Sequence, residues 1–399
     1  MNRGTIASAR NVLLAAVVAV SFGCGDSDQP SSAPPLTTAA LLQRGPEGVG
    51  VTTSEFEDTS RSTMANGNVP GLPSRTLPTE IWYPTDPSQP GATDDEARDA
   101  PLRRGGTRHP LIIYSHGFMD TRGGGTALAQ HLASYGYIVA SADFPLTNLN
   151  TPGGPNARDL VNQPGDVHFL IDRLLALSAD SHSFFAGAID PDRIGLTGLS
   201  LGGSTTFLAT FHPTLRDPRV RAAAPIAGMA CFFGSKFYGD RHVPLLIVHG
   251  SIDAIVPYQQ NAVFGFSQAN TPKYLATLAD ASHTGFTSAG VLLFENLRNP
   301  DDVGCKALGG GTHGDDGGPS FTDLLGGADA GIIMGDCPPG CADPTPRPRA
   351  MRPSRQLALE RLAILPFFDA YLRNDQRARA FLEHTLAAEN ADITLQAQP

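Results

Sequence analysis

The sequence predicts an α/β fold in which a mostly parallel β-sheet is flanked by helices. From Pro110 onward, short apolar runs alternate with longer helix-compatible segments. Short, fully apolar runs are typical of parallel strands, because helices cover both faces of such a sheet. A stretch rich in Gly, Asp and Pro at residues 299–348 breaks the alternation, which predicts an insertion before the C-terminal helices.

The elements are expected in a regular order along the chain. Two strands, at residues 50–57 and 76–83, precede the alternating part. The elements of that part are expected at residues 111–114 (strand), 126–135 (helix), 138–142 (strand), 165–177 (helix), 194–197 (strand), 205–211 (helix), and 220–226, 244–248 and 274–278 (strands). Helices at residues 354–372 and 377–386 close the chain and are expected to cover the sheet.

Composition places the chain among ordinary globular proteins and argues against polyanionic partners. Of its 399 residues 41% are hydrophobic and 17% charged, which is enough apolar material for a large core. The formal net charge is −10 and no block of Lys or Arg occurs, so we expect no nucleic-acid partner. We expect a monomer that touches a membrane only through a lipid anchor.

The N-terminus has the features of an export signal. Arg3 and Arg10 precede a short apolar stretch, Val12 to Phe22, which runs into Gly23-Cys24. The sequence around Cys24 resembles the lipobox of bacterial lipoproteins, in which that cysteine is lipidated, and plain cleavage nearby is the alternative. We therefore expect a signal peptide at residues 1–23, a flexible tether at 24–45 and one catalytic domain at 46–399, in an envelope lipoprotein or a secreted protein.

Export changes the interpretation of the cysteines. Apart from Cys24, four remain, and an even number in an oxidising compartment predicts two disulfides; the four are Cys231, Cys305, Cys337 and Cys341. Cys337 and Cys341 could close a small loop, which would leave the other two to pair. A zinc site that includes His313 is a weaker alternative, because the paired spacing of structural zinc sites is missing. Calcium binding at residues 315–317 is another weak alternative, because EF-hand-like spacing is absent.

The sequence Gly198-Leu-Ser-Leu-Gly202 marks the candidate nucleophile. An apolar run precedes it and helix-compatible residues follow, so Ser200 is expected on a sharp strand–turn–helix junction, the nucleophile elbow. Glycines suit such a turn because strand and helix approach closely there. A Gly/Ser turn without chemistry is the alternative reading.

A serine nucleophile needs a base and an acid that orients the base. Asp253 and His283 follow the strands at 244–248 and 274–278, and loops at the carboxyl ends of parallel strands share one edge of the sheet. We expect Ser200, Asp253 and His283 to form a catalytic triad. Asp280 is the alternative acid, less favoured because it lies on the loop of His283 itself.

Two backbone N–H groups are expected to bind the oxyanion. One belongs to Leu201, directly after the nucleophile, and the other to Phe118, in the loop after the strand at 111–114. Gly117 allows that loop to turn inward, and His116 is expected to be structural. Apolar residues near the site are candidates for an acyl pocket, with core packing as the alternative: Phe118, Met119, Ile255, Val256 and Phe286.

Several longer motifs resemble one superfamily. They are Glu80-Ile-Trp-Tyr-Pro84, Tyr114-Ser-His-Gly117, His131-Leu-Ala-Ser-Tyr-Gly-Tyr137, Asp190-Pro-Asp-Arg-Ile-Gly195, Gly198-Leu-Ser-Leu-Gly-Gly203 and His249-Gly-Ser-Ile-Asp253. Over residues 76–371, apart from the insertion, the chain resembles bacterial α/β-hydrolases of the platelet-activating-factor acetylhydrolase and dienelactone-hydrolase-like group. The resemblance implies an α/β-hydrolase fold and the triad and oxyanion roles given above.

Some positions depart from related families. True dienelactone hydrolases use cysteine where Ser200 stands, which favours an ordinary serine esterase. Cutinase-like polyester hydrolases are similar too, but they usually carry an aromatic residue and a methionine around the serine, where this chain has Leu199 and Leu201. They also tend to have a tryptophan where this chain has Ala227-Gly228.

The sequence therefore predicts a serine carboxylic ester hydrolase that acts on small or lipid-like esters. It needs neither a cofactor nor a metal for this chemistry. A polyester hydrolase is the main alternative, and a peptidase or amidase would use the same triad. A non-catalytic binding module is disfavoured because all three triad positions are filled. The insertion follows the His283 loop, so we expect it to overhang the mouth of the site and shape access.

Overall fold

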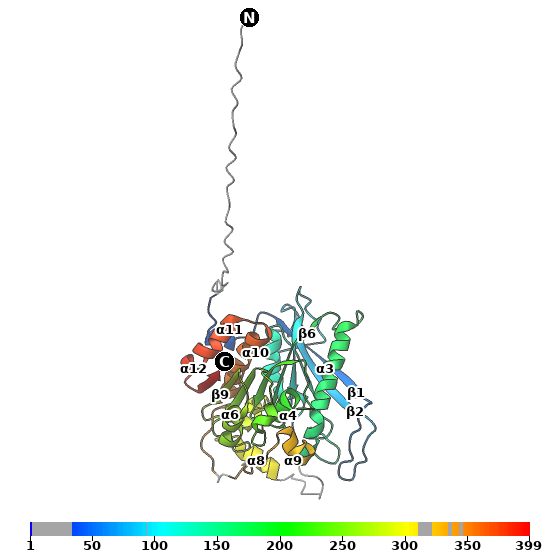
Figure 1. Cartoon of the computed structure of the whole chain (residues 1–399), viewed down its shortest axis with the longest axis vertical. Helices are drawn as coiled ribbons and strands as arrows, with labels where there is room; N and C mark the ends of the chain where they lie inside the picture. Colours follow the sequence, from blue (N-terminus) through cyan, green and yellow to red (C-terminus); the bar gives the residue numbers. More distant parts are fainter. Residues whose placement is uncertain (2–33, 94, 310–320, 334–336, 343–345) are drawn as a thin grey trace. The chain divides into compact units, whose positions relative to one another are not determined.

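The computed structural model describes residue 1 and residues 34–93, 95–309, 321–333, 337–342 and 346–399. Residues 35–399 form one compact unit. The described residues build a single ten-stranded sheet of order β10-β9-β8-β7-β6-β4-β5-β2-β1-β3. Strands β4 to β9 run parallel, whereas β2 pairs antiparallel with β5 and β10 pairs antiparallel with β9. The mostly parallel α/β sheet expected from the sequence is confirmed (Figure 1).

The strands of the sheet are β1 (Gly48–Asp58), β2 (Arg75–Thr85), β3 (Ala97–Arg98), β4 (His109–Ser115), β5 (Ile138–Ala142), β6 (Ile189–Leu199), β7 (Val220–Ile226), β8 (Leu245–Gly250), β9 (Lys273–Leu278) and β10 (Ile393–Gln398). The α-helices in the described residues are α1 (Thr38–Leu42), α2 (Thr126–Ser134), α3 (Gln163–Ala179), α4 (Leu201–Phe211), α5 (Ser235–Tyr238), α6 (Phe264–Gln268), α7 (Gly290–Leu293), α8 (Asp301–Gly309), α9 (Phe321–Leu324), α10 (Pro353–Leu372), α11 (Gln376–Ala380) and α12 (Leu386–Glu389).

Helices cover both faces of the sheet because alternate residues of each strand point to opposite sides. In β4, Ile112 and Tyr114 pack with residues of α2 and α10, whereas Leu111 and Ile113 pack with residues of α3. Helices α4 and α6 continue the layer of α3 over β7, β8 and β9. Both faces of the central strands are therefore buried, which explains why those strands read as unbroken apolar runs.

The structure differs from the expected elements at both ends of the chain. Residues 35–45 do not form a free tether: α1 contacts α10, and Leu41 is buried in the main core. The Ser, Pro, Thr and Ala composition concealed the leucines that dock this helix. At the other end, β10 adds an edge strand. Its mostly polar sequence did not predict a strand, because only Ile393 of β10 is buried.

The insertion at residues 299–348 contains regular structure, one whole disulfide and one cysteine of the second. Helix α8 lies at its start, and the bridges join Cys231 to Cys337 and Cys305 to Cys341. All four predicted cysteines are thus paired, but the local Cys337–Cys341 loop is wrong. The pairing also excludes the zinc alternative, and within the described ranges no cluster of three or more His, Cys, Asp or Glu residues could hold a metal.

Some expectations lie outside the described residues. The signal peptide, Cys24, His313 and the acidic stretch at 315–317 all fall there. Among the helices that are described, none is long and apolar enough to cross a bilayer. The two disulfides indicate an oxidising compartment, in agreement with the expected export.

A buried ion-pair network fixes the long connection between β1 and β2. Arg75 is fully buried and binds Asp166 through Nε at 2.7 Å and Asp159 through Nη2 at 2.8 Å. Arg61, in the connection itself, binds Asp166 at 2.7 Å and Asp58 at 2.7 Å. Because Asp159 and Asp166 belong to the segment around the start of α3, these contacts fasten the connection to the body of the domain.

We expect Arg75→Ala to lower the free energy of unfolding by about 3–5 kcal/mol, because it leaves buried Asp159 without its cationic partner and buried Asp166 with Arg61 alone. Arg98→Ala is the control: Arg98 also pairs with a carboxylate, Glu80, but 54% of its side chain is exposed. That change is expected to lower the free energy of unfolding by about 0–1 kcal/mol. Urea unfolding followed by the fluorescence of Trp82, the single tryptophan, measures both. Equal losses in the two variants would contradict a dominant role for Arg75.

Candidate active site

Ser200 lies on a strained turn between β6 and α4. Its backbone has φ 57° and ψ −117°, a conformation that L-residues rarely adopt. The Ser200 N–H donates to the carbonyl of Ile226 at 2.9 Å, which ties the turn to the end of β7. The sequence-predicted strand–turn–helix junction is present, and this conformation directs the serine away from the sheet edge.

Glycines around Ser200 allow the neighbouring loop to pack against it. A side chain at Gly202 would collide with the carbonyl of Ser115 at the end of β4. A Cβ at Gly117 would lie 3.5 Å from the Cβ of Ser200. The loop after β4 therefore runs directly beside the serine, as the oxyanion hypothesis requires.

The candidate acid and base meet at the ends of two neighbouring strands. Asp253 follows β8 and His283 follows β9, and His283 Nδ1 donates to Asp253 Oδ2 at 2.7 Å. The other oxygen of Asp253 accepts the N–H groups of Ile255 at 2.9 Å and Val256 at 2.7 Å. With its proton on Nδ1, His283 presents Nε2 as a free base. The competing acid Asp280 is exposed, in a turn with φ 55°.

A second imidazole contacts the same carboxylate. His249 is fully buried in β8, and its Nε2–H donates to the carbonyl of Val256 at 2.8 Å and lies 3.3 Å from Asp253 Oδ2. The carbonyl can only accept, so Nε2 carries the proton. Asp253 therefore accepts hydrogen bonds from His283 and from two backbone N–H groups, with the polar N–H of His249 close beside it, and these contacts hold it in one orientation.

The electrostatics of the pair favour a charged imidazole. Burial, the largest influence, lowers the pKa of His283, but the charge and hydrogen bond of Asp253 and the charge of Asp301 outweigh it and raise the pKa above its ordinary value. Burial raises the pKa of Asp253, but the charge of His283 and the hydrogen bonds of His249 and His283 hold it well below its ordinary value. The site thus stabilises the imidazolium that forms when a base accepts a proton.

His116 orients the candidate oxyanion peptide. Its Nε2 accepts the N–H of Phe144 at 3.1 Å, so Nδ1 carries the proton and donates to the Gly117 carbonyl at 2.7 Å. Burial lowers the pKa of His116 and keeps it neutral. In a trans peptide the N–H points opposite to the carbonyl, so fixing the Gly117 oxygen also fixes the N–H of Phe118. No acceptor within the described part of the chain takes that N–H.

The second candidate donor is the N–H of Leu201, at the first position of α4. The first N–H groups of a helix have no partner inside the helix, and the helix dipole favours negative charge there. Leu201 itself is 2% exposed, so its side chain belongs to the core while its backbone faces the turn.

Within the described residues, His283 donates to Asp253 through Nδ1 and to Asp301 through its backbone N–H, and its carbonyl accepts from the N–H of Phe286; none of these hydrogen bonds reaches Ser200. Ser200 lies at the end of β6 and only β7 separates β6 from β8, so all three candidates share the carboxyl edge of the sheet. In ligand-free enzymes, catalytic hydrogen bonds are often long, and they shorten when the substrate binds.

Two of the residues predicted to line an acyl pocket are core residues. Phe286 packs in the main core and Val256 is buried, with 3% exposed for each. Ile255 is half-buried, with its Cδ1 facing Gly304 of α8, and Met119 is half-buried with φ 60°. Apolar residues in these loops turn inward because α8 and the sheet cover them.

Asp301, at the start of α8, is a residue that the sequence reasoning missed. It is fully buried, and its Oδ2 accepts the N–H groups of Ala254 and His283, each at 3.0 Å. Its Oδ1 accepts the N–H of Thr284 at 2.7 Å. One carboxylate therefore binds both the loop of Asp253 and the loop of His283. The only sequence signal is an acid that opens a helix, which ordinarily indicates no more than favourable helix electrostatics.

The insertion is anchored to these loops by further contacts. The N–H of Cys341 donates to the carbonyl of Ala254 at 2.5 Å, and Cys341 is bridged to Cys305 of α8. Gly304 packs so closely that a side chain there would collide with Thr284. The described part of the insertion thus packs against the loops that carry Asp253 and His283. This contact is separate from any effect of the insertion on substrate access.

Comparison with known proteins agrees with this geometry. A family model described as PETase: PET hydrolase-like matches residues 101–295, which include the elbow, Asp253 and His283. A solved structure, a ferulic acid esterase from Streptomyces cinnamoneus, superimposes with a TM-score of 0.59, covering 89% of this chain and 98% of that chain at 20% identity. The structural likeness shows an α/β-hydrolase fold, and the family match over residues 101–295 agrees with it.

Two curated relatives are similar over part of the chain. Cutinase est1 from Thermobifida alba is 28% identical over 175 residues, which cover 43% of this chain and 52% of the cutinase. A poly(3-hydroxyoctanoate) depolymerase from Pseudomonas fluorescens is 31% identical over 138 residues, which cover 33% of this chain and 47% of the depolymerase. The chain thus spans about half the length of these relatives. The relatives named here are carboxylic ester hydrolases.

The contacts of Asp301 generate a prediction about pH dependence. A base must be neutral to accept a proton, so kcat/KM is expected to rise with pH through a midpoint above the ordinary histidine value of about 6.5. Asp301→Asn removes a negative charge near His283, which lowers the pKa of that imidazole and moves the midpoint to lower pH. The looser loops should also reduce kcat/KM by about tenfold to a hundredfold.

Asp302→Asn is the matched control, because it removes the same charge one residue away. Asp302 pairs with Arg347 at 2.7 Å, and 38% of its side chain is exposed. Its pH midpoint should equal that of the unaltered protein. If both variants moved the midpoint by the same amount, Asp301 would have no specific action on His283.

Proposed function

We propose that the chain is a serine-dependent carboxylic ester hydrolase. The observation that carries this proposal is the buried Asp253–His283 pair, joined at 2.7 Å at the same sheet edge as a serine held at φ 57°. Such a pair supplies the base that a serine hydroxyl needs in order to attack at neutral pH. The named relatives, all ester hydrolases, support the same reaction class.

In the proposed mechanism His283 Nε2 accepts the proton of the Ser200 hydroxyl while the serine oxygen attacks the ester carbonyl. Asp253 stabilises the imidazolium, and the N–H groups of Phe118 and Leu201 bind the oxyanion of the tetrahedral intermediate. The imidazolium then protonates the leaving alcohol, which leaves an acyl-enzyme on Ser200. Water, activated by the same base, releases the acid and restores the serine.

A polyester hydrolase is the second candidate. The family model that matches residues 101–295 is described as PET hydrolase-like, and two relatives are named as a cutinase and a polyester depolymerase. Leu199 precedes the serine and Ala227-Gly228 stands beyond β7, so the aromatic side chains expected there in cutinase-like enzymes are absent, and Leu201 stands where those enzymes usually carry methionine. We therefore favour soluble esters with flexible chains over rigid aromatic polymers.

Export is proposed together with this activity. The two disulfides support an extracytoplasmic location, and we propose that Cys24 carries a lipid anchor. Mass spectrometry of the mature N-terminus tests this: a diacylglyceryl-modified Cys24 supports the anchor, and an unmodified new terminus contradicts it.

We expect the purified protein to hydrolyse p-nitrophenyl acetate and to be labelled by a fluorophosphonate at one serine. Ser200→Ala should abolish the labelling and reduce kcat by about 10⁴-fold or more, because the nucleophile is lost. Intact-mass measurement and stopped-time assays record both results. Ser204→Ala is the control, since Ser204 lies one turn along α4 and its hydroxyl contacts the carbonyl of Met229.

The alternatives give different outcomes in the same assay. Cleavage of chromogenic peptides at rates above those of the esters would indicate a peptidase. Release of soluble monomers from a polyester film would favour the polyester hydrolase. Full ester activity in Ser200→Ala would overturn the serine mechanism.

A further inference from the structure

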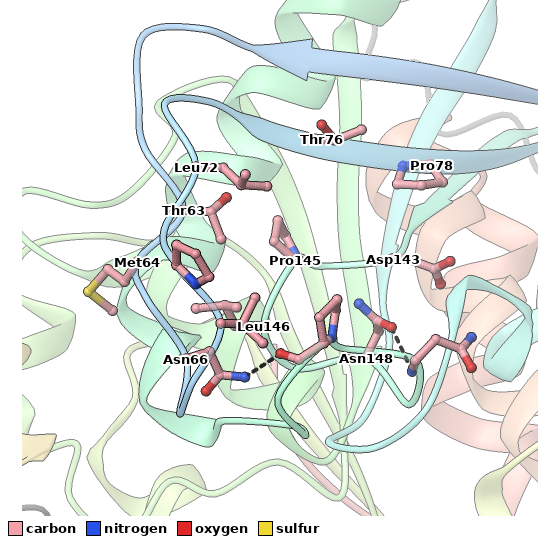
Figure 2. A pocket seen from close by; sticks show the side chains of 14 residues that line it. Thr63, Met64, Asn66, Leu72, Thr76, Pro78, Asp143, Pro145, Leu146 and Asn148 are labelled. Atoms are coloured by element: carbon pink, nitrogen blue, oxygen red, sulfur yellow. Dashed lines mark hydrogen bonds between the residues drawn. The ribbon is translucent and has the colours of Figure 1, made fainter.

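A cavity of about 300 Å³ lies between the β1–β2 connection and the loop after β5 (Figure 2). We call it the hairpin cavity. It is lined by Thr63, Met64, Asn66, Val69, Pro70, Leu72, Thr76, Pro78, Asp143, Pro145, Leu146, Asn148, Asn150 and Pro152. Figure 2 shows Met64 and Leu72 from the connection and Pro145 and Leu146 from the loop around one hollow. None of these residues belongs to the proposed triad or oxyanion donors.

Two of the asparagine side chains of the hairpin cavity, Asn66 and Asn148, are engaged in building its walls. Asn66 Nδ2 donates to the carbonyls of Pro152 at 2.8 Å and Gly154 at 2.6 Å, which joins the two sides. Asn148 donates to the carbonyl of Phe144 at 2.7 Å and accepts from the backbone of Asn150 at 2.8 Å. These amides are therefore occupied, and the apolar side chains remain to contact an occupant.

The charge of the hairpin cavity is also neutralised. Asp143 is its single charged lining residue, and its carboxylate accepts the backbone N–H of Arg122 at 2.6 Å and forms an ion pair with the guanidinium of the same residue. An ionic ligand would find no free counter-charge on these walls. The lining thus fits an uncharged, apolar occupant.

The far wall is held in place by the network of Arg61 and Arg75 described above. Both arginines bind Asp166, so the β1–β2 connection cannot move away from the domain without breaking buried ion pairs. The cavity is therefore preformed, and a ligand need not supply the free energy to order it.

The near wall is paired with the candidate oxyanion loop. The N–H of Met119 donates to the carbonyl of Thr147 at 3.0 Å, and the N–H of Leu149 donates to the carbonyl of Asp120 at 2.8 Å. Met119 directly follows Phe118, so the candidate oxyanion loop is hydrogen-bonded to the loop after β5, which supplies one wall of the hairpin cavity.

The sheet order sets the span between the two places. From β6, which carries Ser200, the strands follow as β4, β5 and β2, and the cavity is lined by the start of β2 and the loop after β5. Neighbouring strands lie about 4.8 Å apart, so two to three strand spacings, about 10–14 Å, separate the two places across the sheet. Two of the lining side chains are exposed and apolar: Met64 is 49% and Leu72 57% exposed.

We propose that the hairpin cavity is a subsite that holds the apolar chain of a long or polymeric ester while the ester group lies at Ser200. The proposal rests on the function proposed above and adds a substrate class, namely esters whose chain extends well beyond the reacting carbonyl. An acetate ester is too short to reach the cavity, so the subsite should contribute nothing to its hydrolysis.

Substitutions at exposed lining residues test the proposal without disturbing the core. Leu72→Asp and Met64→Asp place a charge in the cavity, and each should lower kcat/KM for p-nitrophenyl laurate by about tenfold while leaving p-nitrophenyl acetate within about twofold of the unaltered protein. Leu72→Met, which conserves volume and polarity, should retain laurate hydrolysis. Lauryl acetate, followed by acid release, is the third probe: a loss with laurate assigns the cavity to the acyl chain and a loss with lauryl acetate to the alcohol chain. Either result supports the proposal.

Leu292→Asp is the matched control. Leu292 lies on α7 and is 87% exposed, so the same chemical change removes apolar surface outside the cavity. If this variant lost laurate hydrolysis as fully as Leu72→Asp, general adsorption to apolar aggregates would explain the effect and the subsite would be wrong.

An unchanged laurate-to-acetate ratio in both cavity variants would overturn the subsite alone. Absence of any ester hydrolysis by the unaltered protein would overturn the proposed function, and the subsite with it.

Discussion

The buried Asp253 carboxylate is the group on which the rest of the site depends. A carboxylate without water around it is stable only if its charge is matched by donors, and here His283, His249 and two backbone N–H groups supply them. Those donors come from β8, the loop after it and the loop after β9, so the parallel sheet has to bring three separate segments to one point. The direction of the resulting pKa shifts, with Asp253 lowered and His283 raised, is the electrostatic signature of a pair built to carry opposite charges.

The features that could be predicted from sequence share one physical origin. Strands β4 to β9 are buried on both faces and therefore appear as apolar runs, and Asp253 and His283 are placed by the rule that strand ends in a parallel sheet meet at one edge. The elbow at Ser200 could be predicted because its glycines are required by close backbone contacts, such as that of Gly202 with Ser115.

The features that sequence did not disclose depend on contacts between distant segments. Asp301 resembles any acid at a helix start, and only the folded chain shows it binding two loops 47 and 18 residues away. Cys231 pairs with Cys337 across 106 residues, although the sequence spacing alone also allowed a local bridge between Cys337 and Cys341. In the same way Leu41 docks because a partner surface on α10 exists, which no local pattern reveals.

The short segment from Cys337 to Cys341 is fastened at two separate points, one after β7 and the other in α8. Bridges closing loops of this size stabilise a fold by about 3–5 kcal/mol each. The practical consequence concerns how the protein must be produced. Synthesis in a thiol-rich cytosol would leave α8, and with it the Asp301 carboxylate, held by non-covalent contacts alone, so oxidative maturation is part of assembling the reactive loops and not merely a late reinforcement of the surface.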